Sequence, residues 1–359
     1  MNYFDRNRAK TLCAATLTVG MAVSSAWADD LTIGFITHAQ GNPYLEQIID
    51  GGKAATADLK LILNAQRSAG ASPENQLKLA QGLVNAGAAG IATSAPGDAM
   101  AKGINDIADS GVPVVQFDIP SPAIKATYIG EKSVEGGRVL GKAIVDKLGG
   151  VSATGKVIIG ICFPGGPGLI KRNQGVMESL AAAPGLNVLG PFDVKVSAVD
   201  NYNHWEQLYA ANPDAVAMIG LCEPDLASLG KLNAAHGDKF VAGGYDLSEA
   251  NLAAIRGGHA HAAIGTSPFV KGYLAVVLLE QAIKAKRPTP EGGFYDSGIQ
   301  LVTTNGATMG HGLPDLTLDK LIALSKDPAA TAEFYKPWST SVLAADTPPG
   351  LLSIAAESE

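Results

Sequence analysis

Two stretches of this chain repeat one pattern, GIATSAPGDAMAKGINDIADSGVPVVQFD at 90–118 and AVAMIGLCEPDLASLGKLNAAHGDKFVAGGYD at 215–246. Each begins with an apolar run, continues through a turn that contains Pro and Asp, and then has a helix-length stretch. A break that contains Gly follows, and a second apolar run ends at Asp118 in one copy and at Asp246 in the other. This order predicts a β-α-β unit that occurs twice, with a carboxylate at a strand end in each copy.

The same alternation extends on both sides of each copy. Nearly every predicted strand is a continuous apolar run, which is typical of parallel strands covered by helices on both faces. The sequence therefore predicts an α/β fold of two lobes, each a doubly wound parallel sheet. The predicted strands of the two lobes are Leu31–Ile36, Lys60–Leu63, Ala89–Thr93, Val112–Phe117, Lys156–Ile161, Leu186–Leu189, Ala215–Leu221 and Phe240–Tyr245. The predicted helices are Pro43–Ala57, Pro73–Ala86, Ala99–Ala108, Ile170–Ala183, Asn203–Ala211, Leu226–Ala235 and Glu249–Arg256.

The pattern weakens after the second copy. A strand at Ala262–Ile264, a long apolar helix at Phe269–Lys284 and a strand at Ile299–Thr303 are predicted, and their pattern does not assign them to a lobe. From Gly312 the repeat is lost. Short amphipathic helices are predicted there at Leu318–Leu324 and Ala329–Tyr335.

The first 28 residues have the features of a secretory signal peptide. Three basic residues precede a short apolar run at 11–23, and Ala26-Trp27-Ala28 is a small-x-small cleavage site. We therefore expect an exported chain that begins near Asp29 and resides in a bacterial periplasm. Removal of three basic residues and Asp5 changes the formal net charge from −7 to −9, and an acidic chain without a basic tract argues against nucleic acid as a partner.

Only Cys162 and Cys222 remain after that cleavage, because Cys13 lies within the signal peptide. Each ends an apolar run of the second lobe, and a doubly wound order makes those two strands neighbours. An oxidising compartment permits a disulfide, but a bridge between adjacent parallel strands is geometrically awkward. We therefore favour two buried thiols and keep the disulfide as the alternative.

Ligands of open α/β sheets bind outside the carboxyl ends of the strands. Asp118 and Asp246 lie at such ends and are predicted to accept hydrogen bonds from ligand hydroxyls, the alternative being solvated strand-end carboxylates. Asp98 and Asp225 precede helices in the two copies, so helix capping explains them better. Asn42 is either an N-cap or a ligand donor, and Tyr44 either stacks on an apolar sugar face or packs in the core.

Arg172 is the donor predicted for the second lobe. It lies in GGPGLIKRNQG, at the start of a helix, where a guanidinium can donate several hydrogen bonds to a sugar. No phosphate-loop ending follows the glycines. His259 and His261 lack a third ligand, so no metal site is predicted. Two facing aspartates could also be the catalytic carboxylate pair of a glycosidase, which is the enzymatic alternative.

Five segments together resemble the ribose-binding, type I class of periplasmic solute-binding proteins, which serve ATP-binding-cassette importers. They are IGFITHAQGNPYLEQIIDGGKAA at 33–55, VPVVQFD at 112–118, KRNQGV at 171–176, GGYD at 243–246 and IGTSPFVKGYLA at 264–275. The resemblance spans Leu31 to Thr303. It implies ligand-binding roles for Asn42, Tyr44 and Leu45 in the first loop and for Asp118, Arg172 and Asp246.

Three positions depart from the pattern of that class. Glu223 is placed to meet a polar ligand where the class often has Asn-Asp, Thr266 replaces a common glutamine, and Ile119 replaces an arginine. These changes reduce the number of hydrogen-bonding groups and argue against ribose itself. We expect a sugar or polyol of another shape, with Glu223 and Thr266 among the ligand-binding residues.

The resemblance also implies an interleaved domain organisation. An N-terminal lobe of residues 29–131 and 267–297 and a C-terminal lobe of residues 132–266 and 298–311 would close on the ligand. Three crossings near Glu131, Thr266 and Ser297 would form the hinge, and residues 312–359 would be an extension.

The implied protein is a monomer without cofactor or catalysis that delivers its ligand to a membrane permease. The alternatives are a receptor for a furanose signal or a nucleoside linked to chemotaxis and a periplasmic glycoside-processing enzyme. A sugar-responsive repressor is disfavoured, because a signal peptide stands where that class has its DNA-binding motif.

Overall fold

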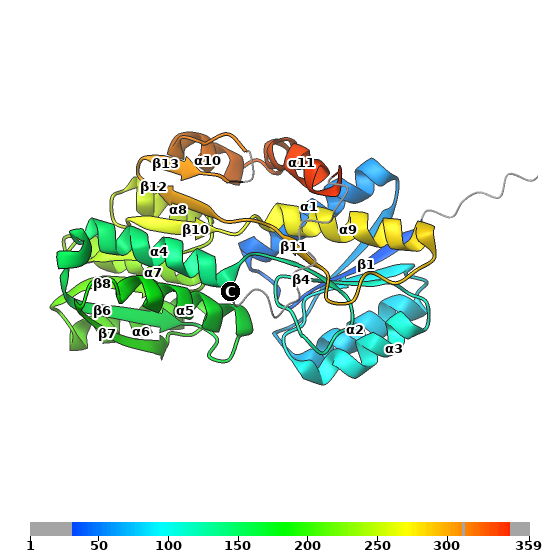
Figure 1. The fold of residues 1–359 in the computed structure, drawn as a ribbon, viewed down its shortest axis with the longest axis horizontal. Helices are drawn as coiled ribbons and strands as arrows, with labels where there is room; N and C mark the ends of the chain where they lie inside the picture. The colour runs from blue at the N-terminus through cyan, green and yellow to red at the C-terminus, as the bar shows by residue number, and fades with distance from the viewer. Residues whose placement is uncertain (1–30, 311–312, 345–359) are drawn as a thin grey trace, which may run out of the picture.

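The computed structural model describes residues 31–310 and 313–344, which form two α/β lobes joined side by side (Figure 1). The predicted signal peptide lies outside the described residues. Within the described part of the chain, no helix is both long and apolar enough to cross a membrane.

The first sheet has six strands, all parallel, in the order β11-β5-β4-β3-β1-β2. We call this sheet and its helices the N lobe. Its strands are β1 (Thr32–Thr37), β2 (Ile62–Arg67), β3 (Gly90–Thr93), β4 (Val114–Phe117), β5 (Thr127–Gly130) and β11 (Phe294–Asp296). Its helices are α1 (Pro43–Leu59), α2 (Pro73–Asn85), the 3-10 turn Asp98–Met100, α3 (Ala101–Asp109) and α9 (Pro268–Ala285).

The second sheet has seven strands in the order β13-β12-β10-β9-β8-β6-β7, of which β12 and β13 run antiparallel to their neighbours. We call this sheet and its helices the C lobe. Its strands are β6 (Thr154–Ile161), β7 (Gly185–Asp193), β8 (Ala215–Gly220), β9 (Val241–Tyr245), β10 (Ala262–Gly265), β12 (Gln300–Thr303) and β13 (Gly306–Thr308). Its helices are α4 (Ser133–Lys147), the 3-10 turn Gly150–Ser152, α5 (Pro167–Leu180), α6 (Ala198–Ala211), α7 (Glu223–Ala235) and α8 (Glu249–Arg256).

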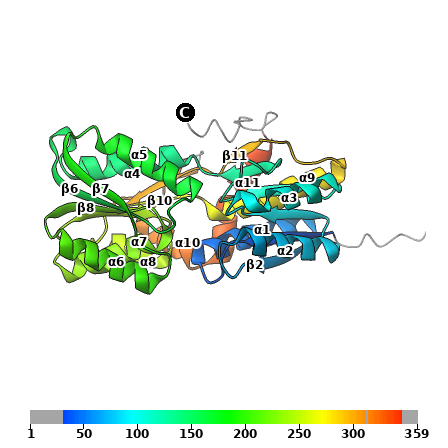
Figure 2. The same ribbon diagram turned by 90° about the horizontal axis from the view of Figure 1, so that it is seen from below.

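Helices cover both faces of the second sheet, with α4 and α5 on one side and α6, α7 and α8 on the other (Figure 2). The chain passes between the two sheets three times, after β5, after β10 and after β11. The predicted fold class, two doubly wound lobes joined by a three-crossing hinge, is therefore confirmed. Two further helices, α10 (Leu318–Ser325) and α11 (Pro328–Ala344), follow the last strand.

Several element boundaries differ from the sequence prediction. Helix α6 begins at Ala198 instead of Asn203, because the Ser197 hydroxyl accepts a hydrogen bond from the Asp200 N–H and caps the helix at that point. Strand β7 extends to Asp193, four residues beyond the predicted end. Strand β5 and helix α4 were not predicted, although they form the first crossing and its continuation.

The preference for two free thiols was wrong, because Cys162 and Cys222 form a disulfide. Their strands β6 and β8 are neighbours, as expected. Both cysteines lie just past the paired strands, however: Cys162 follows β6 directly and Cys222 is the N-cap of α7. The geometric restriction on adjacent parallel strands does not apply there, and the two Cα atoms lie 6.0 Å apart, within the usual range for a disulfide.

Candidate functional site

The two strand-end aspartates have the same backbone geometry. Asp118 follows β4 with φ 63°, and Asp246 follows β9 with φ 69°. Each N–H donates to a carbonyl at the end of the adjacent strand, Asp118 to Ile129 at 3.0 Å and Asp246 to Ile264 at 2.7 Å. Aspartate adopts this left-handed conformation more readily than most residues. The repeated sequence pattern therefore produces the same bend twice, and each bend carries a carboxylate.

These bends meet at a cleft of about 360 Å³ between the two lobes. The strand-end loops of both sheets line it, as the rule for open α/β sheets predicts. Of the seven predicted binding residues, six line this cleft: Asn42, Tyr44, Asp118, Arg172, Glu223 and Asp246. The seventh, Thr266, is fully buried at the second crossing, and its hydroxyl lies 3.4 Å from the Tyr44 hydroxyl and 3.5 Å from Asp246 Oδ1.

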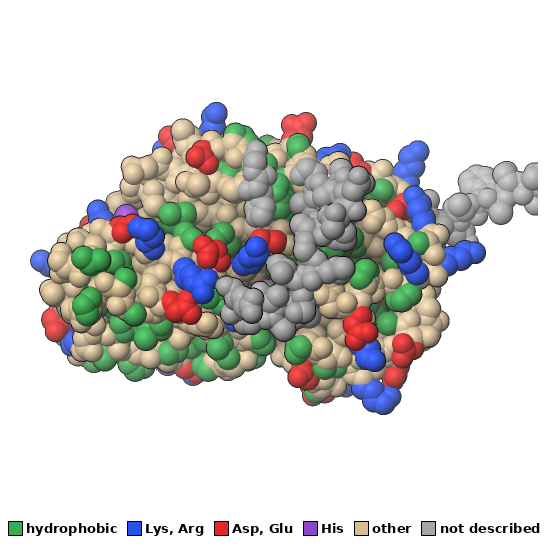
Figure 3. Space-filling model, viewed as in Figure 1, with side chains coloured by type: hydrophobic (Ala, Val, Ile, Leu, Met, Phe, Trp, Pro, Cys, Tyr) green, Lys and Arg blue, Asp and Glu red, His purple; other side chains and the backbone are tan. Residues whose placement is uncertain are grey.

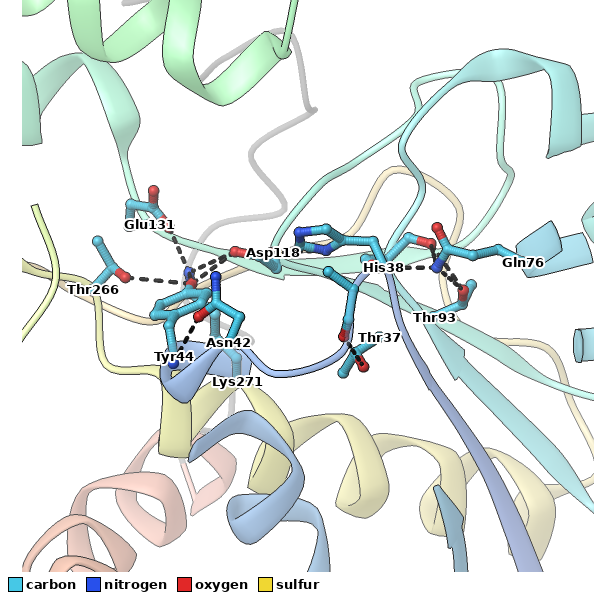
Figure 4. Close-up of polar contacts among 12 residues, drawn as sticks. Thr37, His38, Asn42, Tyr44, Gln76, Thr93, Asp118, Glu131, Thr266 and Lys271 are labelled. Atoms are coloured by element: carbon cyan, nitrogen blue, oxygen red, sulfur yellow. Dashed lines mark hydrogen bonds and ion pairs between the residues drawn. The ribbon is translucent and has the colours of Figure 1, made fainter. Parts of the chain in front are cut away.

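A buried chain of polar contacts runs from the N lobe to the C lobe beside the cleft, and Figure 4 shows the part of it that Asp118, Tyr44, Lys271 and Glu131 form. The Tyr44 hydroxyl donates to Asp118 Oδ1 at 2.7 Å and accepts from Lys271 Nζ at 2.6 Å. Lys271 also donates to Glu131 Oε2 at 2.6 Å, and Glu131 Oε1 accepts from Arg172 Nη2 at 2.7 Å. We call these five residues the hinge polar chain, because Glu131 lies at the first crossing between the lobes.

Close helix approaches place the members of this chain. In the N lobe, α1 carries Tyr44 and α9 carries Lys271, and a Cβ atom at Gly272 would lie 1.8 Å from the Ile48 carbonyl oxygen. In the C lobe, α5 carries Arg172, and a Cβ at Gly175 would lie 1.9 Å from the Val134 carbonyl oxygen on α4. Only glycine permits either contact, so these two residues set the helix spacing that brings the charges together.

The charges of the hinge polar chain stabilise one another. Burial opposes ionisation of Glu131, yet the neighbouring Lys271 and Arg172 hold its pKa well below the ordinary value. Burial likewise opposes the charge on Arg172, and the carboxylates of Glu131 and Asp246 more than compensate, so that its pKa is raised. For Tyr44, burial and the nearby carboxylates raise the pKa, so its hydroxyl remains protonated and donates to Asp118.

The C-lobe side of the cleft has a different electrostatic character. Burial raises the pKa of Asp246 to about 7; Arg172 lowers it and the nearby Glu223 raises it. Burial also raises the pKa of Glu223, against a hydrogen bond from Ser248. This side therefore presents two carboxyls that hold protons more readily than ordinary acids.

Arg172 retains donors for a ligand. Its Nη1 donates to the Leu221 carbonyl oxygen at 3.0 Å, and its guanidinium lies 4.1 Å above the centre of the Tyr245 ring. A guanidinium has five N–H donors, so the bonds to Leu221 and Glu131 leave others that can point toward the cleft.

Two other cleft residues of the N lobe are partly engaged. The Asn42 side-chain oxygen accepts the Tyr44 N–H at 2.9 Å, so Asn42 is the N-cap of α1 and its NH₂ is the group that can donate to a ligand. Figure 4 shows His38 on the far side of Asp118 from Tyr44, with 3.6 Å between His38 Nδ1 and Asp118 Oδ2. Burial lowers the pKa of His38, while Asp118 raises it.

Helix capping explains only one of the two turn aspartates. Asp225 accepts the Cys222 N–H at 2.8 Å in a capping box, as predicted, and also accepts from Asn201 and Trp205 in the C-lobe core. For Asp98 the prediction was wrong: its carboxylate accepts the Ser121 hydroxyl at 2.6 Å, and its 3-10 turn has no side-chain cap.

Lys271 and Glu131 were not predicted to be site residues. A signal was present for both. Lys271 is a lone charge near the start of the long apolar helix α9, and Glu131 directly follows the buried strand β5. A charge in an apolar run needs a buried partner of opposite sign, and here each supplies the other's partner.

His259 and His261 do not form a metal site together. The His259 Nδ1 atom lies 2.9 Å from Asp238 Oδ1, on the surface. Within residues 31–310 and 313–344, no group of three His, Cys, Asp or Glu side chains has an arrangement that would hold a metal ion.

Two α/β lobes joined by three crossings, with a polar cleft between their strand ends, define the class of two-lobed binding proteins that close on a ligand by a hinge motion. Comparison with known proteins agrees. Residues 33–287 match the family model described as periplasmic binding protein domain, and the chain belongs to this family. The similar proteins are sugar-binding transport proteins, not enzymes. Some of them are described as solute-binding or sugar-binding proteins of ATP-binding-cassette transporters.

Two curated relatives are similar in sequence. The ribose import binding protein RbsB of Haemophilus influenzae is 25% identical over 289 residues, which cover 77% of this chain and 94% of that protein. The xylose/arabinose-binding protein XylF of Sulfolobus acidocaldarius is 23% identical over 69% of this chain, and the match spans 65% of that protein.

Solved structures of sugar-binding proteins share the fold. A solute-binding protein from Burkholderia graminis in complex with D-arabinose has a TM-score of 0.71 at 21% identity, covering 76% of this chain and 95% of that one. One from Actinobacillus succinogenes with bound D-allose has a TM-score of 0.71 at 17% identity, covering 76% and 98%.

Proposed function

We propose that this chain binds a sugar or a polyol in the cleft between its lobes and delivers it to the permease of an ATP-binding-cassette importer in the periplasm. The observation that carries the proposal is the convergence of six predicted polar residues, from both lobes, on one cleft of about 360 Å³. Hydroxyl-rich ligands need many hydrogen-bond partners of both kinds, and this cleft provides carboxyls, an amide and a guanidinium.

The proposed roles follow from the hydrogen-bond donors and acceptors that each side chain still has after its contacts within the protein. Asp118 and Asp246, one from each lobe, would accept hydrogen bonds from ligand hydroxyls, and Glu223 would add a third carboxyl. Arg172 and the Asn42 NH₂ would donate. Tyr44 would cover an apolar ligand face with its ring, while its hydroxyl remains bound to Asp118. Thr266 would act from behind Tyr44 and Asp246.

Hinge closure would follow from ligand contacts made by both lobes. A ligand shifts an open–closed equilibrium only by its difference in affinity for the two states. Because acceptors and donors come from both lobes, a bound sugar would complete its hydrogen bonds only in the closed state. The closed form would then be the one that the permease recognises. On the face shown in Figure 3, acidic and basic side chains lie interspersed, which suits a protein partner better than a polyanion.

A thermal-shift screen tests this proposal. The mature protein would be unfolded, refolded and screened against pentoses, hexoses, deoxy sugars and polyols, and a ligand present at a thousandfold excess over Kd stabilises by about 4 kcal/mol. We expect a rise of several degrees in melting temperature for at least one sugar or polyol. Asp246→Ala should abolish this rise, whereas Asp214→Ala, a change of an exposed carboxylate on the C-lobe surface, should preserve it.

Two results would contradict the proposal. One is a silent panel together with no low-mass carbohydrate released from the freshly purified protein, as judged by mass spectrometry. The other is an unchanged ligand response in Asp246→Ala. Transport is tested separately: cells that lack this chain should lose uptake of the radiolabelled ligand and regain it on complementation.

A further inference from the structure

The C-terminal segment 313–344 lies outside the residues that the family model matches and outside the ligand cleft. It consists mainly of helices α10 and α11. Figure 1 shows α10 above β12 and β13 of the C lobe and α11 above α1 and α9 of the N lobe. Two consecutive helices therefore rest on different lobes.

Helix α10 is attached to the C lobe. Its Leu321 side chain is buried. Its two ends are held by ion pairs to α8, with Asp319 Oδ1 3.1 Å from Arg256 Nη2 and Lys326 Nζ 2.7 Å from Glu249 Oε1. Exposed ion pairs add little stability individually, but together with the buried apolar face they fix the direction of the helix.

Helix α11 is attached to the N lobe. The Tyr335 ring is buried and stacks on Phe269 of α9 with 6.2 Å between ring centres. Lys336 Nζ lies 2.7 Å from Asp58 Oδ1 near the end of α1, and Trp338 of α11 is also buried. The attachment thus reaches both helices that carry Tyr44 and Lys271 of the hinge polar chain.

The connection between the two helices is short and hydrogen-bonded. Helix α10 ends at Ser325 and α11 begins at Pro328. The Asp327 carboxylate accepts the N–H groups of the first turn of α11, and the Thr331 hydroxyl donates to the Leu324 carbonyl oxygen at 2.7 Å. The connection is too short to extend much further, so a relative motion of the lobes must deform it or detach one of the two helices.

The segment also approaches the ligand site from behind. A small cavity of about 40 Å³ lies between the helices and the hinge, with Leu321 and Tyr335 in one wall and Thr266 in another. Tyr44 and Asp246 line both this cavity and the ligand cleft, so these two side chains separate the two spaces. The helices and the cleft are therefore on opposite sides of the hinge.

We propose that residues 313–344 act as a hinge brace that restricts the angle between the lobes. These helices and the cleft lie on opposite sides of the hinge. When the cleft opens, the parts of the two lobes that contact the helices move toward each other, and when the cleft closes, those parts move apart. The packed helices would resist the first motion, and their attachments to α8, α1 and α9 would resist the second. The brace would thus hold the cleft near its ligand-ready geometry before binding, which reduces the free energy required for closure. This inference concerns the free protein and does not depend on the identity of the ligand.

Interlobe distances measured without ligand test the proposal. Nitroxide labels on genetically encoded ketone residues at Lys102 of the N lobe and Glu206 of the C lobe leave the disulfide intact, and pulsed electron spin resonance gives the distance distribution. The variants are a chain that ends at residue 310 and the full-length Tyr335→Ala/Lys336→Met. Glu333→Gln, an exposed change on α11, is the matched control.

We expect broader distributions in both variants, with added population at longer distances, and an unchanged distribution in the control. If the shortened chain does not fold, the full-length double variant decides. Unchanged distances in that variant would overturn the proposal. A lower melting temperature with unchanged distances would overturn it equally, because the segment would then stabilise the lobes without restraining the hinge.

Discussion

The two strand-end aspartates have the same backbone and different electrostatic surroundings. Both have left-handed φ angles and the same main-chain hydrogen bond to the adjacent strand. Asp118, however, has a cation at 3.6 Å, Lys271 Nζ, and a hydroxyl donor in Tyr44. Asp246 has Thr266 at 3.5 Å, while the nearby Arg172 is bound to Glu131. The difference shows that the repeated β-α-β unit determines where each carboxyl lies, whereas helix α9 and the first crossing determine its electrostatic environment.

The substitution with the largest expected effect on this electrostatic difference is Lys271→Met. It removes the cation from the Asp118 side and leaves Glu131 buried with Arg172 as its remaining charged partner. Because removing one partner of a buried ion pair is costly, we expect a loss of about 3–5 kcal/mol in the free energy of unfolding. Urea denaturation of the variant and the wild type would measure it.

The control for this change is Lys102→Met on α3 of the same lobe, where Lys102 pairs with Asp106 and both side chains are exposed. That variant should lose less than about 1 kcal/mol. Equal losses in the two variants would mean that the hinge polar chain contributes no more than a surface ion pair, contrary to the contacts described above.

A second comparison concerns the turn aspartates, Asp98 in the N lobe and Asp225 in the C lobe. Asp225 is fully buried, and removal of its carboxylate leaves the Trp205 indole N–H and the Cys222 N–H without their acceptor. The Asn201 amide loses one acceptor and keeps two backbone carbonyl oxygens. We expect Asp225→Ala to lower the free energy of unfolding by about 2–3 kcal/mol.

Asp98→Ala removes one hydrogen bond, to Ser121, from a half-exposed turn. It should lower the free energy of unfolding by about 1 kcal/mol or less. Chemical denaturation of both variants measures the difference. A larger loss in Asp98→Ala would reverse the assignment of the C-lobe turn as the more tightly packed of the two.

The fold was predictable because its signals are local. Continuous apolar runs separated by helix-length segments specify parallel strands and crossovers, and the aspartates that end two of them mark the cleft. Six predicted side chains line one cleft for this reason: they follow strands whose ends the topology brings together. The second crossing lies next to Thr266, where a crossing was predicted. The Thr266 side chain, however, faces the small cavity behind the cleft, because the crossing turns it toward Tyr44 and Asp246.

What could not be predicted depends on pairing between distant segments. Lys271 and Glu131 are 140 residues apart, and neither has a local partner in the sequence. The disulfide is a similar case. In the C lobe, Cys162 follows β6 and Cys222 follows β8. The equivalent positions in the N lobe are His38 after β1 and Ala95 after β3. The equivalence rests on matched bonds, from Ser94 N–H to the Ile36 oxygen and from Leu221 N–H to the Gly160 oxygen. Only the three-dimensional position past the strand ends shows that this pair of places suits a disulfide.

The pH dependence of stability isolates the ionisation of Asp246. Burial raises its pKa from 3.8 to about 7, so the folded state binds a proton there that the unfolded state releases above about pH 4. Stability must then fall as the pH rises through this interval and level off above about pH 7. With a midpoint near pH 7, the Asp246 contribution between pH 6 and pH 8 is about 1 kcal/mol.

Asp246→Asn removes this contribution because the amide does not titrate. Its free energy of unfolding, measured by urea denaturation at pH 6, 7 and 8, should decline by about 1 kcal/mol less than that of the wild type. The carboxyl of Asp225 titrates in both proteins and cancels in the difference. Asp118→Asn retains the Asp246 carboxyl and should retain its pH dependence. If Asp118→Asn flattened the profile and Asp246→Asn did not, the electrostatic contrast between the two strand ends would be the opposite of the one inferred from their neighbours.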